Sequence, residues 1–100
     1  MAKIGVAVPH HLSQDEALRR IKGLLGEVKE EFADKISGLK EEWNGNSGTF
    51  SFSIMSMSVS GTLTVLPAEV RLDGTVPFAA LLFKNKIEET IRERASKLLA

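Results

Sequence analysis

Two adjacent histidines, His10 and His11, are the only imidazole groups in the chain. Imidazole is the commonest metal ligand in proteins and the usual acid–base group near neutral pH. A zinc site needs three or four ligands, and the spacing of the other residues suggests no third ligand beside these two. We therefore expect no bound metal and no cofactor. One imidazole ring is expected to cap or pack at the junction between a strand and a helix.

The serines of this chain form no known nucleophilic motif. There is no nucleophile elbow and no Ser-x-x-Lys sequence. Residues 44–48 contain two glycines but lack the lysine and the following helix of a phosphate-binding loop, so they predict a turn. The carboxylates fall on the polar faces of predicted helices or in turns, and no acid–base pair can be named among them. We expect no catalytic residues and a protein that is not an enzyme.

Residues 78–83, Phe-Ala-Ala-Leu-Leu-Phe, are a continuous apolar run at the start of a predicted helix. A helix with one buried stripe needs only about half of such a run. Side chains left exposed would form a surface for a partner, a lipid or a polymer. The alternative is that this helix start is wedged deeply between the sheet and a neighbouring helix. The candidate apolar partner or ligand surface comprises Phe78, Leu81 and Leu82, together with Trp43.

The composition is that of an ordinary globular domain, with 43% apolar and 26% charged residues. The 100 residues suffice for one domain, residues 1–100, with a modest core. Thirteen basic residues balance thirteen acidic ones, so no basic excess favours nucleic acid as a partner. The absence of cysteine excludes disulfides and thiolate metal sites. No stretch is long enough for a signal-peptide core or a transmembrane segment, which predicts a cytoplasmic protein.

The elements that must position these residues are clearest in residues 50–65, where apolar and hydroxyl side chains alternate. Phe50, Phe52 and Ile54 occupy even positions, whereas Met57 and Val59 occupy odd ones. Successive side chains on a strand point to opposite faces, so each run has one apolar face and one hydroxyl face. The change of phase predicts a hairpin or a strong bend near residues 54–57.

A helix is predicted after a first strand at residues 3–8. Ser13 is its expected N-cap, and Glu16, three residues later, is expected to complete a capping box. An apolar stripe at helical spacing continues as far as Ile36. Gly38 is the expected stop of this helix, because glycine adopts the backbone conformation that ends many helices.

Further strands are expected at residues 39–43 and from residue 70 onward. Pro77 suits the first turn of a second helix, whose apolar stripe includes Phe83. The order β-α-β-β-β-β-α predicts a two-layer α+β domain, in which an antiparallel sheet of four to five strands has two helices packed on one face. The other face of the sheet carries serine and threonine; it is solvated, or it meets a second subunit or a ligand.

Several unusual blocks follow one another along the chain. In order, they are Pro9-His10, Leu12-Ser13, Glu16-Ala17, Trp43-Asn44-Gly45-Asn46, Phe50-Ser51-Phe52-Ser53, Val59-Ser60-Gly61-Thr62-Leu63-Thr64-Val65, Pro77-Phe78-Ala79-Ala80 and Lys86-Ile87-Glu88. These blocks resemble the polyhydroxyalkanoic acid system protein family, essentially from end to end. That family often has a glycine where this chain has Ser56, and a glycine would ease the turn predicted there.

The resemblance implies a bacterial protein associated with gene regions for storage-polyester synthesis and granule proteins. It supplies no activity and no catalytic residues. We therefore expect a non-enzymatic accessory protein that binds the polyhydroxyalkanoate granule surface, an acyl ligand or a granule protein. Two alternatives stay open, a small enzyme acting on hydroxyacyl thioesters and a structural homodimer. The element order also resembles an abbreviated helix-grip fold, as in START-like lipid binders, although a fold does not fix a function.

Overall fold

The computed structural model describes residues 2–31, 34–54 and 56–100, and for residues 31 and 79–81 it describes the backbone alone. The elements are β1 (Ala2–Pro9), α1 (Gln14–Ile21), α2 (Leu24–Glu31), β2 (Ile36–Asn44), β3 (Ser47–Ile54), β4 (Met57–Val65), β5 (Glu69–Val76), the 3₁₀ helix η1 (Phe78–Phe83) and α3 (Lys84–Leu99).

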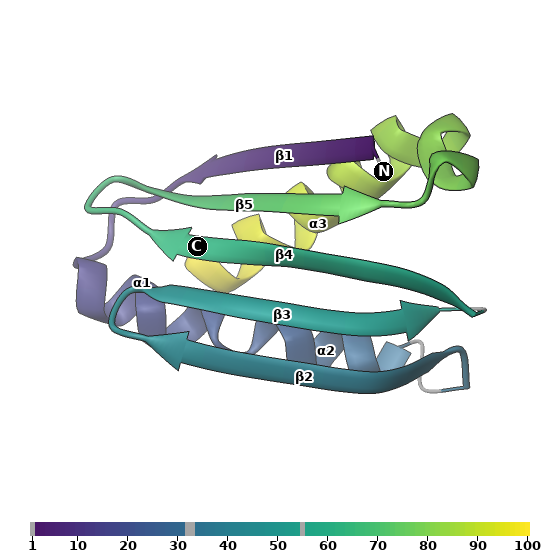
Figure 1. Cartoon of the computed structure of the whole chain (residues 1–100). Coiled ribbons are helices and arrows are strands. Elements are labelled where there is room, and N and C mark those ends of the chain that lie inside the picture. Colours follow the sequence, from purple (N-terminus) through teal and green to yellow (C-terminus); the bar gives the residue numbers. More distant parts are fainter. Residues whose placement is uncertain (1, 32–33, 55) are drawn as a thin grey trace.

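The five strands form one antiparallel sheet in the order β1-β5-β4-β3-β2 (Figure 1). Consecutive strands from β2 to β5 pair as hairpins, and β1 pairs with β5, the last strand of the sequence. The segment containing α1 and α2 therefore carries the chain from one edge of the sheet to the other. This arrangement confirms the predicted α+β architecture.

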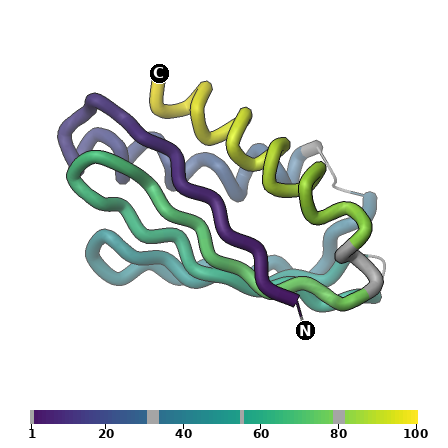
Figure 2. The backbone as a smooth tube through the Cα atoms, turned by 90° about the horizontal axis from the view of Figure 1, so that it is seen from above, coloured from purple at the N-terminus to yellow at the C-terminus, as the bar shows by residue number. Residues whose placement is uncertain are grey.

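The helices α1, α2 and α3 lie on one face of the sheet and form the second layer (Figure 2). In Figure 1, α3 lies behind β4 and β5, and α2 lies behind β3 and β2. Alternate residues of the strands point into the space between the layers, where apolar side chains leave water. The buried core consists of Ala2, Ile4, Val6, Val8, Ala17, Ile21, Leu24, Leu25, Phe50, Leu63, Val65, Val70, Leu72, Val76, Ala95 and Leu99.

The face of the sheet away from the helices carries hydroxyl side chains from neighbouring strands. Phe50 and Leu63 are buried on the helix side, so the residues beside them in β3 and β4, among them Thr49 and Thr62, point the other way. Across β4 and β5, the Ser60 and Thr75 hydroxyls form a 3.0 Å hydrogen bond. We call this side of the sheet the hydroxyl face; Lys3 and Asp73 also lie on it.

The hairpin predicted from the change of phase is confirmed. Ile54 pairs with Met57 across β3 and β4, and Ser56 in the connection has a φ of +68°. This is the left-handed region, which L-residues other than glycine, asparagine and aspartate rarely adopt. The second residue of the turn, Met55, lies outside the described residues.

The first predicted helix is present as two helices that are separated at Lys22 and Gly23. Gly23 N–H donates to the Arg20 carbonyl at 3.1 Å, a bond one residue shorter than in an α-helix. The predicted N-cap is confirmed, since Ser13 Oγ accepts from the Glu16 N–H at 3.1 Å. The predicted return bond of the capping box is not found, because the Glu16 carboxylate accepts from Arg19 and Arg20.

The predicted end of that helix is wrong, because Ile36 and Gly38 both lie in β2. The pairing of β2 with β3 shifts register between Ser37 and Lys40, and Gly38 has a φ of +64° there. A glycine with positive φ suits a β-bulge as well as a helix end, so its presence alone did not separate the two structures. The described part of α2 ends at Glu31, and Phe32 lies outside the described residues.

The two edges of the sheet are protected in different ways. At β1, the Gly5 N–H donates to Glu88 Oε2 of α3 at 3.0 Å, so the helix satisfies an outward-pointing donor of the edge strand. At β2, the bulge is followed by the charged residues Lys40, Glu41 and Glu42, and bulges and charges both discourage pairing with another strand. No helix in the described part of the chain has both the length and the apolar content to cross a membrane.

Candidate interaction surface

The apolar run 78–83 folds into η1, between the end of β5 and the start of α3. A 3₁₀ helix has three residues per turn, so six consecutive apolar residues are spread over all of its sides. The rest of the domain covers only part of such a helix. The side chains of Phe78, Leu82 and Phe83 are 67%, 91% and 60% exposed.

The run was expected to be either partly exposed or wedged deeply between the sheet and a helix, and these fractions show that three of its side chains are exposed. Phe78, Leu82 and Phe83 are not wedged between the sheet and a helix, and they form what we call the η1 surface. The prediction that Phe83 belongs to the buried stripe of the last helix is wrong, because α3 begins only at Lys84. Leu81, the remaining predicted residue of this run, has its side chain outside the described part of the structure.

Trp43 lies far from η1, on the opposite edge strand of the sheet and close to the β2–β3 turn. Its ring is partly buried against the core, and its Nε1–H donates to Glu41 Oε2 at 2.8 Å. The ammonium of Lys22 lies 5.6 Å from the ring centroid. A side chain at Gly48 would approach the ring to 2.6 Å, so this glycine makes room for the indole. The structure therefore does not bring Trp43 together with Phe78 and Leu82.

His10 packs at the junction after β1, as predicted for one of the two histidines, and it is 5% exposed. Its Nδ1 accepts a hydrogen bond from the Leu12 N–H at 3.1 Å, and its Nε2 lies 3.0 Å from the Leu66 carbonyl oxygen. A carbonyl can only accept, so the ring carries its proton on Nε2. Both ring nitrogens serve the fold and link the start of α1 to the β4–β5 turn.

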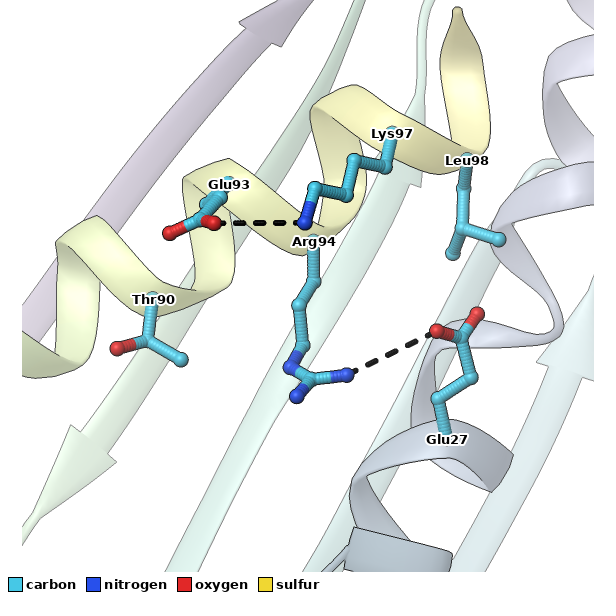
Figure 3. A pocket seen from close by; sticks show the side chains of 6 residues that line it. All are labelled: Glu27, Thr90, Glu93, Arg94, Lys97 and Leu98. Atoms are coloured by element: carbon cyan, nitrogen blue, oxygen red, sulfur yellow. Dashed lines mark ion pairs between the residues drawn. The ribbon is translucent and has the colours of Figure 1, made fainter.

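Within the described residues, no three His, Asp or Glu side chains lie close enough together to hold a metal ion. A surface hollow of about 230 Å³ lies between α2 and α3 (Figure 3). In it Arg94 reaches from α3 toward Glu27 on α2, at 3.8 Å, and Lys97 pairs with Glu93 at 3.4 Å. The Arg94–Glu27 pair joins the two helices, whereas Lys97 and Glu93 pair within α3.

A second, shallower hollow of about 610 Å³ is formed by strand residues alone. Its lining residues are Lys3, Ile4, Thr49, Phe50, Ser60, Gly61, Thr62, Asp73, Gly74 and Thr75. His10 belongs to neither hollow, and neither one is bounded by both the sheet and α3. A cavity between the sheet and the last helix is what the thioester-enzyme hypothesis requires, so these two hollows do not support it.

Comparison with known proteins assigns the chain to a family. The sequence model of the polyhydroxyalkanoic acid system proteins matches residues 4–99. This chain belongs to that family. The match covers nearly the whole domain, from β1 to the end of α3, so the predicted resemblance is confirmed. No curated protein matches the chain.

For this polyhydroxyalkanoic acid system protein, the main feature missed by sequence reasoning is Phe83. The run of six apolar residues was the available signal, since it holds more apolar side chains than one stripe can bury. The sequence alone did not show that the first turn would be 3₁₀ and that Phe83 would stand outside the stripe of α3.

Proposed function

We propose that this chain is a non-enzymatic, cytoplasmic accessory protein of the bacterial polyhydroxyalkanoate system, and that it binds the granule through the η1 surface. The observation that carries the proposal is the exposure of Phe78, Leu82 and Phe83 within one short helix. The family assignment supplies the storage-polyester system as the context.

The free energy of apolar burial favours the binding of a partner that covers this surface. Covering a Phe or Leu side chain contributes about 1.5–3 kcal/mol, and in the isolated chain these three side chains remain largely in water. Single exposed apolar residues are ordinary, whereas a cluster of large ones indicates an interaction site. The occupant in this proposal is the granule surface, with an acyl ligand or a granule protein as alternative occupants.

Two observations support a non-enzymatic role. His10 uses both ring nitrogens within the fold, which leaves it no free nitrogen for general acid–base chemistry. The hollow between the helices holds paired charges, and the hollow on the sheet is open and lined by strand residues. No specific contact in either place favours the alternative of an enzyme acting on hydroxyacyl thioesters.

The test is cosedimentation of the pure protein with purified polyester granules. The wild-type chain is expected in the pellet, and Leu82→Ser is expected to shift it at least tenfold toward the supernatant. Leu82 is 91% exposed, so its replacement should leave the thermal unfolding midpoint nearly unchanged.

The control is Leu66→Ser, the same chemical change at a half-buried position in the β4–β5 turn. This turn lies at the opposite end of the sheet from η1 (Figure 1), so the folded variant should still sediment with granules. The proposal fails if the wild-type protein stays in the supernatant and no granule protein captures it. It also fails if Leu82→Ser unfolds the domain, because the run would then belong to the core.

A further inference from the structure

The N-termini of α1 and α3 are built in opposite ways. Helix α1 has the Ser13 cap and acidic residues, Asp15 and Glu16, in its first turn. These features suit the unpaired N–H groups and the positive end of the helix dipole. Helix α3 starts after Phe83, which provides no side-chain cap, and its first turn contains Lys84 and Lys86 and no acidic residue.

The start of α3 is not a free helix end, because η1 runs directly into it. Lys84 and Lys86 therefore do not face a set of unpaired N–H groups, and the helix dipole gives no reason for their position. The feature that adjoins these lysines is the η1 surface, which ends at Phe83.

The charged residues that follow η1 most closely in the chain are basic. Lys84 comes directly after Phe83, and Lys86 comes two residues later. Glu88, the first carboxylate of α3, is directed to the Gly5 N–H of β1. The first charged residues after the apolar run are thus two lysines, while the first carboxylate of α3 is bound to the edge strand.

We propose that the η1 surface docks on an anionic lipid surface. Phe78, Leu82 and Phe83 enter the boundary between headgroups and acyl chains, and Lys84 and Lys86 contact the phosphate groups. This inference rests on the proposed function, since it uses the same surface, and it specifies the chemistry of the occupant. Exposed aromatic and leucine side chains beside lysines are the pattern of proteins that bind at membrane interfaces.

The lysines decide between an anionic lipid and a neutral occupant. On a neutral polyester or acyl surface, the ammonium groups gain no Coulombic attraction and only the apolar side chains contribute. Near an anionic lipid surface, each lysine strengthens binding by about fivefold at physiological ionic strength. Two lysines are therefore expected to contribute about 25-fold, and high salt is expected to remove most of that factor.

The experiment is cosedimentation of the full chain with vesicles of phosphatidylcholine alone and of phosphatidylcholine with 30% phosphatidylglycerol, at low and high salt. The wild-type protein is expected to prefer the anionic vesicles, with a preference that falls as salt rises. The double variant Lys84→Gln/Lys86→Gln should bind them about 25-fold more weakly, whereas Leu82→Ser should reduce binding to every vesicle. The control Lys29→Gln/Lys40→Gln changes the net charge equally on exposed residues of α2 and β2 and should bind as the wild type does.

A stability measurement separates a docking role from a structural one. Replacing both lysines should leave the thermal unfolding midpoint nearly unchanged while vesicle binding falls. A marked fall of the midpoint would overturn the inference, because the lysines would then support the fold. Equal binding to neutral and anionic vesicles, or to polyester granules without any effect of the lysine changes, would also overturn it and leave the proposed function standing. Binding to neither vesicles nor granules would overturn both.

Discussion

His10 shows how a residue with catalytic potential can be fully occupied by structure. The buried ring accepts a hydrogen bond from the Leu12 N–H and contacts the carbonyl of Leu66, which lies 56 positions after His10. It thus joins the segment before α1 to the β4–β5 turn. Removing it would leave both backbone groups without these partners. A buried polar group that has lost its hydrogen-bond partner destabilises the folded state.

We therefore expect His10→Ala to lower the free energy of unfolding by about 1–3 kcal/mol. Chemical denaturation followed by circular dichroism would measure it. The neighbouring exposed residue gives the control, since His11→Ala should change the free energy by no more than about 0.5 kcal/mol. Equal effects of the two variants would contradict the structural role assigned to His10.

Ser56 holds a backbone conformation that suits glycine better. Its φ is +68°, and this left-handed conformation costs an L-residue about 1–2 kcal/mol. Glycine adopts it without that cost, but its more flexible unfolded chain lowers the free energy of unfolding by about 0.5–1 kcal/mol. Ser56→Gly is thus expected to raise the free energy of unfolding by about 0.5–1 kcal/mol. The same change two residues later, Ser58→Gly in β4, should lower it by about 0.5–1 kcal/mol. Thermal unfolding of both variants would test the pair, and stabilisation by both would contradict the explanation.

The hydrogen bonds of Glu16 make the stability of the folded chain depend on pH. The Arg19 guanidinium, followed by that of Arg20, hydrogen-bonds its carboxylate and lowers the pKa of Glu16 from 4.5 to about 2. Because the folded pKa lies below the unfolded one, Glu16 stabilises the fold above pH 4.5, and this contribution disappears as the pH falls toward 2. The unfolding midpoints of wild type and Glu16→Gln should therefore converge between pH 5 and about 2. Equal unfolding midpoints of wild type and Glu16→Gln at about pH 7 would contradict this contribution.

At the scale of elements, glycines have opposite roles in α2 and in the sheet. A Cβ at Gly26, inside α2, would have no other atom within 4 Å. A Cβ at Gly61 in β4 would lie 2.6 Å from the Asp73 carbonyl oxygen and from Phe50 Cζ. The first glycine only weakens a helix, whereas the second lets β4 and β5 run beneath the Phe50 ring.

Gly26→Ala is accordingly expected to stabilise the domain by about 0.5–1 kcal/mol. Gly61→Ala should destabilise it by about 1–3 kcal/mol, because the new methyl group must displace backbone or the Phe50 ring. Denaturant titration of the two alanine variants would compare them directly. Destabilisation by Gly26→Ala would show that α2 needs the close approach or bend that a glycine allows.

At the scale of the whole molecule, the sheet edges constrain how a homodimer would form. At the β1 edge Glu88 of α3 accepts from the Gly5 N–H, and the β2 edge carries a bulge and three charged residues. Between a sheet edge and the hydroxyl face, we therefore expect the homodimer, which stays a prediction, to use the hydroxyl face. Light scattering should then give twice the mass of one chain, and Thr62→Arg, near the centre of that face, should restore the monomer. A single-chain mass that does not change with concentration would exclude this dimer.

The sequence alone determined the features that depend on residues close together in the chain. The alternation in β3 and β4, the hairpin between Ile54 and Met57 and the Ser13 cap all follow from the geometry of a few consecutive residues. These local patterns sufficed for the α+β class and for the two-layer arrangement. They also singled out the apolar run that forms the η1 surface.

The tertiary structure decided the features that depend on competition between distant segments. Ile36 and Gly38 fit a helix end by local pattern, but pairing with β3 places them in β2. Phe83 fits the stripe of α3, yet the first turn becomes 3₁₀ and leaves the ring in water. Trp43 shares its aromatic character with the η1 surface, but the strand order puts it at the other edge of the sheet. In each case contacts with residues distant in the sequence determined the outcome.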